Sequence, residues 1–461
     1  MKTNFDFLLK EPQFEPFAEA AISAERVLHI SPALCATACR TALEFAVKWL
    51  YSIDSSLTKP YADKLVTLIS TEDFQDLIPS GMAAKINYLR KIGNNATHNP
   101  KSVNKDQAVL ALENLHSFLD FLACCYADSY AETSFDKGII NKVVEPAEVP
   151  LAQPEVEEVD FQTLLDENFP KRPGMTAKRL ERLKRGYEVK PMDMTEAQTR
   201  KAYIDVMLQD AGWERGVNWY DEYPVDNMPN KSGYGAADYV LFADDGMPLA
   251  VIEAKRTSVN VEKGRQQAVL YANFLEQKFG KRPIIFLTNG YETRLWDDRH
   301  YPERLVSGFY SKRDLEQYFG ILKDRKGLKG VQINDAISGR YYQKEAIQAV
   351  CDAIGERNRR KALLVMATGS GKTRTVISLA DVLIRHGWVK NLLFLADRNA
   401  LVTQAKRAFH NELPNLSLCD LTNSKEDANA RAVFSTYQTM MNCIDAMRNE
   451  EGGRLFTPGH F

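Results

Sequence analysis

The sequence predicts a multidomain fold in which an all-α N-terminal domain is followed by two α/β domains. Over residues 1–130, apolar side chains recur at helical spacing and no strand pattern of any length occurs. Residues 195–296 combine a helix, a strand hairpin and further strands, and residues 340–461 alternate strands with helices around a glycine-rich turn. At roughly 100–200 residues per domain, the 461 residues are enough for this arrangement.

Composition and charge exclude several classes of protein. The apolar fraction of 44% and the charged fraction of 26% exclude a collagen-like, disordered or disulfide-dense chain. With 59 Lys and Arg against 61 Asp and Glu, any contact with nucleic acid has to come from local basic patches. The absence of an 18-residue apolar run and of a secretory leader predicts a cytoplasmic protein with no membrane partner. The seven cysteines form no C-x-x-C pair, so we expect reduced core thiols.

The helical domain, residues 1–135, is predicted from two apolar stripes. One stripe is made by Cys39, Ala42, Leu43, Ala46, Val47 and Leu50, and the other by Ala108, Leu112, Leu115, Leu119 and Leu122. Between them, Pro100 and the turn-forming cluster at residues 93–95 (Gly-Asn-Asn) predict a break in the chain.

A linker is predicted over residues 136–165, where prolines at every fourth position alternate with glutamates. Residues 171–190 then carry eight Lys and Arg against two Glu. Two interpretations of this basic segment stay open: a solvated helix face, or a strip that contacts phosphate groups.

The first α/β domain is predicted over residues 166–320. A helix follows Thr195, and strands at 238–243 and 248–255 are joined by the hairpin turn Asp244-Asp245-Gly246. A helix over 261–279 and strands at 283–287 and 292–296 complete the pattern.

A phosphate-binding loop is predicted at residues 367–373, between a buried strand at 362–366 and a helix that starts at Lys372. Glycines allow successive backbone N–H groups to surround phosphates, while the lysine reaches the outer phosphates and the next hydroxyl ligates Mg²⁺. Met366 stands where the usual pattern has glycine. The nucleotide-binding residues are therefore expected to be Thr368, Gly369, Ser370, Gly371, Lys372 and Thr373.

Together with Arg340-Tyr341-Tyr342-Gln343, this loop resembles superfamily-two helicases and translocases. The resemblance implies a partial RecA-like lobe over 321–461, ATP as ligand, and adenine contacts from Gln343. Residues 395–398 and 435–439 are similar to segments of that family that touch the nucleic-acid backbone. No D-E-x-H-like box occurs before Phe461, so we expect no complete ATPase in this chain.

Three side chains of the predicted hairpin point to phosphodiester chemistry. Glu253 and Lys255 are two apart on one strand and share a face, and the turn at 244–246 brings Asp238 beside Glu253. Asp238 and Glu253 are candidate ligands of Mg²⁺, and Lys255 is a candidate for orienting water or stabilising charge. The alternative interpretation is a surface cluster of salt bridges.

The hairpin resembles the PD-(D/E)-x-K nuclease superfamily. Gln267 and Tyr271 match the Q-x-x-x-Y element of its RecB-like branch, where both residues contact DNA. Glu196 occupies the position of that branch's additional helical acid, which implies a further group at the metal site.

A nuclease of this type followed by a superfamily-two motor resembles the restriction (motor) subunit of type I restriction–modification enzymes. The resemblance covers residues 195–461. It implies Mg²⁺-dependent cleavage of unmethylated double-stranded DNA, coupled in the full subunit to ATP-driven translocation. It also implies modification (methyltransferase) and specificity subunits as partners. The alternative from the binding class is a nuclease-inactive fragment that holds ATP or DNA.

The segment from Arg90 to His98 resembles part of HEPN-like helical domains. Ribonucleases of that group place an Arg and a His four to six residues apart, whereas seven residues separate Arg90 and His98 here. We interpret the domain as an interaction module, with a HEPN-type ribonuclease or toxin as the alternative.

Overall fold

The computed structural model describes most of the chain. The described residues are 2–60, 63–79, 81–98, 100, 103–140, 165, 168–169, 171–184, 186–189, 195–226, 228–229, 233–256, 260–424, 428–447 and 454–461. The chain divides into two compact units, and each is treated below by itself. Unit 1 contains Met1–Asp210, Arg256–Val259 and Asn289–Tyr291, whereas unit 2 contains Ala211–Lys255, Asn260–Thr288 and Glu292–Phe461.

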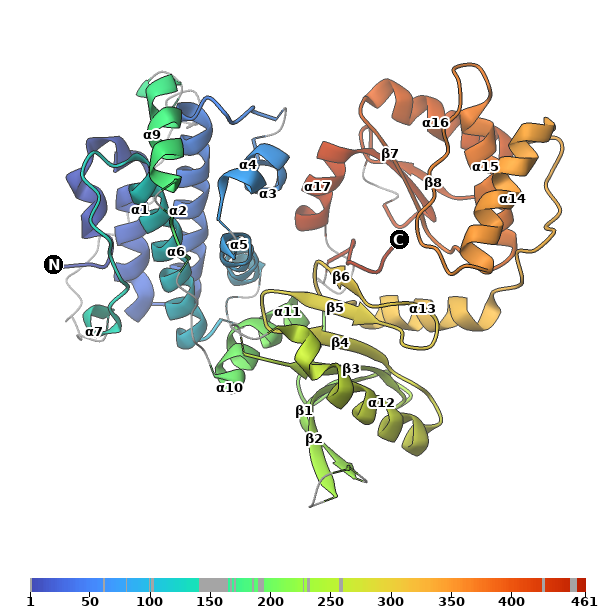
Figure 1. The fold of residues 1–461 in the computed structure, drawn as a ribbon, viewed down its shortest axis with the longest axis horizontal. Helices are drawn as coiled ribbons and strands as arrows, with labels where there is room; N and C mark the ends of the chain where they lie inside the picture. Colours follow the sequence, from blue (N-terminus) through green and yellow to red (C-terminus); the bar gives the residue numbers. More distant parts are fainter. Residues whose placement is uncertain are drawn as a thin grey trace. The chain divides into compact units, whose positions relative to one another are not determined.

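Unit 1 is helical, as the apolar stripes predict (Figure 1). Its helices are η1 (Asp6–Lys10), η2 (Pro12–Phe14), α1 (Glu15–Arg26), η3 (Val27–His29), α2 (Pro32–Ile53), α3 (Leu65–Ser70), α4 (Glu72–Leu77), α5 (Met82–His98), α6 (Lys105–Tyr126), α7 (Lys137–Ile140), α9 (Pro173–Leu183), α10 (Glu196–Thr199), the π-helical η5 (Arg200–Ile204) and α11 (Asp205–Asp210). Both predicted stripes face the core. By length and composition α6 could cross a membrane, but 78% of its apolar window is buried inside the structure, as in a core helix.

The predicted break at Gly93-Asn94-Asn95 is wrong, because α5 continues through it to His98. The reason is the packing of α5 against α2. A Cβ atom on Gly93 would lie 2.5 Å from the Cβ of Arg40, closer than real Cβ contacts. The glycine therefore allows two helix backbones to approach each other, a use that looks the same in sequence as a turn signal.

Part of the basic segment forms α9 (Pro173–Leu183), which packs onto the helical core, and several of its cations have partners there. Arg179 is buried and donates from Nε to the Asp54 carboxylate at 2.8 Å. Lys178 pairs with Asp128 at 2.7 Å, and Arg182 donates to the carbonyl of Cys124 at 2.8 Å. Neither interpretation predicted these contacts with protein groups, and contact of the segment with phosphate stays a prediction.

Asp54 is the polar centre of this packing. Burial alone would raise the pKa of its carboxyl group, but hydrogen bonds from Tyr126 and Ser56 and the charge of Arg179 outweigh it and lower the pKa. The Tyr126 hydroxyl donates to this carboxylate at 2.6 Å and Thr176 donates at 2.9 Å. α2, α6 and α9 therefore share one buried, fully hydrogen-bonded carboxylate.

Unit 2 contains two sheets. The first has the strand order β1-β2-β3-β4-β5-β6 and is antiparallel except for the parallel pair β3–β4. Its strands are β1 (Trp219–Asp226), β2 (Tyr234–Phe242), β3 (Pro248–Ala254), β4 (Ile284–Thr288), β5 (Thr293–Trp296) and β6 (Arg304–Val306). The connection from β3 to β4 passes through η6 (Val261–Gly264) and α12 (Arg265–Phe279), which packs on the sheet. The predicted hairpin at 238–255 is confirmed, whereas β1 and β6 were not predicted.

The second sheet has the order β7-β9-β8 and all its pairs are parallel. Its strands are β7 (Leu392–Ala396), β8 (Leu418–Asp420) and β9 (Ala432–Thr436), and the helices of this region are α13 (Lys312–Asp324), α14 (Tyr341–Gly355), α15 (Lys372–Arg385), α16 (Asn399–Glu412) and α17 (Tyr437–Ala446) (Figure 1). The predicted buried strand at 362–366 is wrong: the segment has no strand structure, and Leu363 and Val365 are both 87% exposed.

The helical N-terminal region and the mixed sheets of unit 2 agree with the predicted multidomain fold class. The predicted linker, 136–165, lies almost wholly outside the described residues, and the domain boundaries drawn beside it stay predictions. All seven cysteines are free thiols and six of them are buried.

Candidate functional site

Asp238 and Glu253 lie on adjacent strands at the end of the hairpin opposite its turn. Tyr239 of β2 pairs with Ile252 of β3, so the residues just outside this pair, Asp238 and Glu253, face one another across the two strands. The Asp238 carboxylate accepts a hydrogen bond from the Ala254 N–H at 2.7 Å. The two residues are 9% and 1% exposed, so both carboxyl groups are held inside the fold.

Lys255 follows directly after β3 and is aimed back at Glu253. Its backbone N–H donates to the carbonyl of Thr288 at 2.8 Å, which continues the pairing of β3 with β4. Its ammonium group forms an ion pair with the Glu253 carboxylate, and its side chain is 18% exposed. The structure therefore places the E-x-K pair on one face, as the strand period predicts.

Gln267 and Tyr271 lie one turn apart on α12 and reach the same place. The Gln267 amide donates to the Tyr271 hydroxyl. Burial raises the pKa of Tyr271 and the hydrogen bond with Gln267 opposes this; the negative charges of Glu253 and Asp238 raise the pKa further, and Lys255 lowers it. The Tyr271 hydroxyl thus lies within electrostatic reach of all three hairpin groups, and the five predicted residues converge.

The donor set at this place fits a magnesium ion. Mg²⁺ keeps several waters and is usually held by one or two carboxylates together with substrate phosphate. Asp238 and Glu253 supply two such carboxylates on neighbouring strands. The side chain of Glu196, the third predicted ligand, lies outside the described residues. Over the described ranges, no group of three or more His, Cys, Asp or Glu forms a metal cage.

A second layer, not predicted from the sequence, supports these groups from η6. A Cβ atom on Gly264 would lie 2.6 Å from Cγ of Glu253 and 3.2 Å from Cε of Lys255. Only a glycine allows the backbone of η6 to pass this close to both side chains. A glycine at the start of a helix, three residues before the Q-x-x-x-Y element, was the available signal.

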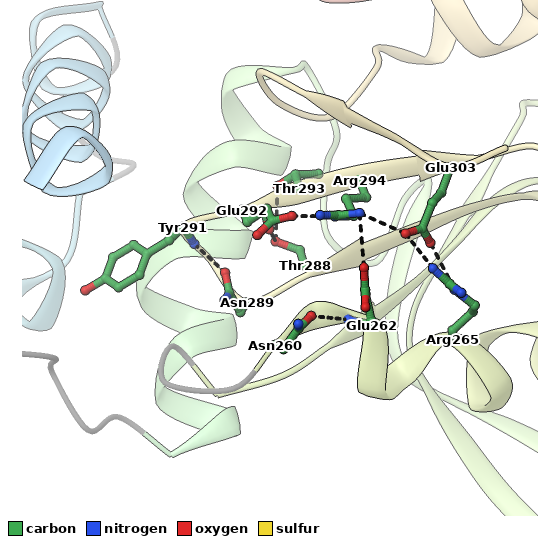
Figure 2. A network of polar contacts seen from close by, with 10 residues as sticks. All are labelled: Asn260, Glu262, Arg265, Thr288, Asn289, Tyr291, Glu292, Thr293, Arg294 and Glu303. Atoms are coloured by element: carbon green, nitrogen blue, oxygen red, sulfur yellow. Dashed lines mark hydrogen bonds and ion pairs between the residues drawn. The ribbon is translucent and has the colours of Figure 1, made fainter. Parts of the chain in front are cut away.

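Figure 2 shows the charge network that holds η6 in place. Arg294 of β5 contacts three carboxylates: Glu292, Glu262 at 3.4 Å and Glu303 at 2.8 Å. Glu303 also accepts from Nε of Arg265, the first residue of α12, at 3.1 Å. The network therefore joins η6 and the start of α12 to β5, on the side of the sheet that carries the hairpin groups.

The predicted phosphate loop precedes α15, and its conformation depends on two glycines. Gly369 and Gly371 have φ values of +79° and +90°, a region that other residues rarely adopt. α15 begins at Lys372, so its N-terminal backbone N–H groups and positive dipole end lie at the loop. Within the loop, the side chains of Thr368 and Thr373 are exposed.

Gln343 at the start of α14 lies against this loop. Its amide donates to the carbonyl of Ser370 at 3.0 Å, and the Tyr342 hydroxyl donates to the same carbonyl at 3.0 Å. The Lys372 ammonium donates to the carbonyls of Met366 and Ala367, each at 3.3 Å. The structure thus brings together the predicted nucleotide-binding residues, with Gln343 contacting the loop backbone.

The two segments similar to nucleic-acid contacts end neighbouring strands. Leu395 pairs with Ser435 and Ala396 pairs with Thr436 at the carboxyl ends of β7 and β9. Asp397 and Arg398 follow β7, where they form an exposed ion pair at 3.2 Å. In unit 1, Arg90 is 8% exposed, and the side chain of His98 lies outside the described residues.

Three family models match different parts of the chain. Residues 193–304 match the type I restriction enzyme R protein N terminus, and residues 336–457 match the res subunit of type III restriction enzymes. Residues 23–138 match a domain of unknown function (DUF4145), which leaves the HEPN-like interpretation a prediction.

Two curated relatives come from Escherichia coli. The endonuclease subunit of type I restriction enzyme EcoAI is 31% identical over 48% of this chain and 29% of its own length. The endonuclease subunit of type I restriction enzyme EcoKI, from strain K12, is 30% identical over 47% of this chain and 24% of its own length. This chain is a relative of the type I restriction R subunits.

A solved structure also matches part of this chain. A fragment assigned to an HsdR subunit of a type I restriction enzyme from Vibrio vulnificus YJ016 is 24% identical, with a TM-score of 0.24. It covers 54% of this chain and 48% of that one. The chain spans less than a third of the length of the two curated type I subunits. The predicted resemblance to the N-terminal part of type I R subunits is confirmed.

Proposed function

We propose that this chain carries the DNA-cleaving site of a type I restriction endonuclease subunit, and that the site consists of Asp238, Glu253 and Lys255. The observation that carries the proposal is the convergence of two buried carboxylates and one ammonium group at the end of the β2–β3 hairpin. Similarity of residues 193–304 to the type I R protein N terminus supports the same assignment.

The chemistry follows from what each side chain presents. Asp238 and Glu253 would hold a Mg²⁺ ion, which when bound neutralises phosphate charge and lowers the pKa of a coordinated water. Lys255, whose ammonium already contacts Glu253, is placed to orient an attacking water or to stabilise negative charge on the phosphate. Gln267 and Tyr271 offer an amide and a hydroxyl next to these groups, and both can donate to a DNA phosphate.

We further propose that the loop at 367–373 binds ATP. Two glycines with positive φ, the N-terminus of α15 and Lys372 give the groups that a triphosphate requires. In the full subunit this nucleotide would drive translocation of DNA, and the modification and specificity subunits would supply methylation and sequence recognition. A cytoplasmic location belongs to the same proposal.

The test is nicking of a supercoiled plasmid by the 461-residue chain, with Mg²⁺ and with EDTA. Lys255→Ala should lower the rate by about a hundredfold or more, because a group that stabilises charge in the transition state is lost. Lys263→Ala is the matched control, since Lys263 is an exposed lysine on η6. Lys372→Ala should leave basal nicking unchanged and abolish binding of ATP.

Binding of Mn²⁺, measured by electron paramagnetic resonance, provides a readout that does not depend on cleavage. Glu253→Gln should weaken it, because one of two carboxylate ligands is lost. Parental nicking by Lys255→Ala would show that the assigned site is wrong. Retained ATP binding without any Mg²⁺-dependent nicking would instead favour the alternative of a nuclease-inactive binding fragment.

A further inference from the structure

The strongest surface feature outside the two sites is a concentration of positive charge in unit 2. Residues 323–329 contain Lys323, Arg325, Lys326 and Lys329 with one carboxylate, Asp324, and residues 357–361 contain Arg357, Arg359, Arg360 and Lys361. Except for the half-buried Arg325, all of these side chains are exposed. We call these two segments the basic ridge. Because the whole chain has a net charge of −2, the ridge is a local feature and not an effect of composition.

The two segments of the ridge lie side by side. Leu328 packs in one apolar cluster with Ile347 and Cys351 of α14, and its carbonyl accepts from Gln348 at 3.3 Å. Lys329 reaches Glu356, the residue before the second segment, at 3.6 Å. Contacts thus hold the chain after α13 against the C-terminal end of α14.

A single tyrosine links the two segments. Arg360 lies over the ring of Tyr301 at 4.9 Å from its centroid, and Arg325 donates to the hydroxyl of the same tyrosine at 3.2 Å. Arg325 also lies over the ring of Trp388 at 4.9 Å. Stacking on aromatic rings orients a guanidinium group without neutralising its charge, so these arginines can still bind anions.

The backbone of the ridge is also held in place. The N–H of Lys326 donates to the backbone carbonyl of His386 at 2.8 Å, and the indole of Trp388 donates to the Lys326 carbonyl at 2.7 Å. Asn358 has a φ of +50°, a conformation that asparagine tolerates better than most residues, and it turns the chain directly after α14. Little ordering would be needed before the ridge could bind a partner.

The eight cations of the ridge outnumber the carboxylate within its two segments, Asp324. Among the residues that the structure describes, Glu356 is the only carboxylate within ion-pair distance of a ridge cation. The negative end of the α14 dipole favours one or two cations near residue 357, but it does not explain four more on the neighbouring segment. A polyanion with regularly spaced charges would fit this surface.

We propose that the basic ridge binds the phosphate backbone of double-stranded DNA at a place separate from both the hairpin carboxylates and the phosphate loop. The ridge residues are distinct from those of the hairpin site and from those of the phosphate loop, which starts at Ala367. Contacts of lysine and arginine with phosphate carry no base preference, so this surface holds DNA of any sequence. The proposal does not depend on cleavage at Asp238 and Glu253.

The test measures binding of a 30-base-pair duplex of arbitrary sequence to the 461-residue chain in EDTA, across a series of salt concentrations. The ridge variant combines Arg357→Gln, Arg359→Gln and Lys361→Gln, which are exposed and leave the stacked arginines intact. At about 100 mM salt it should bind roughly tenfold more weakly or worse, and the slope of log K against log salt should fall by about two to three.

The control variant combines Lys10→Gln, Lys64→Gln and Lys105→Gln, which are exposed cations of unit 1 and give the same change of charge. It should keep the parental affinity and salt slope. Equal duplex binding by the ridge variant and the parent, or equal losses in both variants, would overturn the proposal. Binding of poly-glutamate without binding of duplex would also overturn it, and would assign the ridge to an acidic protein. Thermal unfolding of both variants should match that of the parent.

Discussion

Two apolar segments of unit 2 have nearly the same composition, but one forms a buried strand and the other forms no strand and is largely exposed. Residues 249–252 (Leu-Ala-Val-Ile) form the middle of β3, where each of them is 0% exposed. Residues 362–366 (Ala-Leu-Leu-Val-Met) form no strand, and their Leu363 and Val365 are each 87% exposed.

The difference lies in the neighbours and not in the residues. β3 is paired with β2 on one side and with β4 on the other, and α12 packs on the sheet that they form. Among the described residues, no strand pairs with 362–366, since the nearby sheet contains only β7, β9 and β8. An apolar run becomes a buried strand only when partner strands satisfy its backbone groups.

A matched pair of substitutions tests this comparison and has the largest expected effect. Leu249→Ala should lower the free energy of unfolding by about 2–5 kcal/mol, because it removes a fully buried side chain. Leu363→Ala should change it by less than about 0.5 kcal/mol, because that side chain is exposed. Urea unfolding followed by tryptophan fluorescence measures both. A large loss for Leu363→Ala would place the segment in a buried strand after all.

A second pair of substitutions tests how the two glycines of the phosphate loop, which follows the irregular segment 362–366, contribute to binding of ATP. Gly371→Ala should weaken binding of ATP by about tenfold or more, because alanine is strained at φ +90° and its Cβ would clash with the Gln343 amide. Gly369→Ala, at φ +79° with no atom within 4 Å of the Cβ position, should weaken it by only about three- to tenfold. Isothermal titration with ATP compares them. Equal effects would mean that Gln343 does not pack against Gly371.

The smallest expected effect concerns the support of the hairpin site. Gly264 has a φ of −83°, so alanine suits its backbone and only the contacts with Glu253 and Lys255 are affected. Gly264→Ala should lower plasmid nicking by about three- to tenfold, since a small displacement of reacting groups is enough to slow a reaction. Gly174→Ala, where no atom lies within 4 Å of the Cβ position, is the control. If Gly264→Ala nicks plasmid at the parental rate, the backbone of η6 does not support the hairpin groups.

Local patterns predicted the hairpin and the placement of the side chains along it. The turn Asp244-Asp245-Gly246 predicted the hairpin, and the register beyond the irregularity between Leu241 and Phe242 places Asp238 beside Glu253. The helical spacing of Gln267 and Tyr271 then placed both residues on one side of α12. These features depend on residues close together in the sequence, which is why they could be read in advance.

Features that depend on distant neighbours could not be predicted in this way. The strand expected at 362–366 required partners that no local pattern reveals, and Gly93 was interpreted as a turn because Arg40 lies far away in sequence. The bond between Arg179 and Asp54 joins residues 125 positions apart, so the basic segment was interpreted without its acceptors.

That last contact determines where the helical unit could be cut from the rest of the chain. A fragment ending in the proline- and glutamate-rich stretch before residue 165 would retain Asp54 but lose the guanidinium and hydroxyl donors that α9 brings to it. An inward-facing anion deprived of its counterion is typically destabilising by about 3–5 kcal/mol. A fragment made to express this unit on its own should therefore include at least the residues through Leu183. The proline- and glutamate-rich stretch before residue 165, although its composition is that of a linker, is too early a boundary.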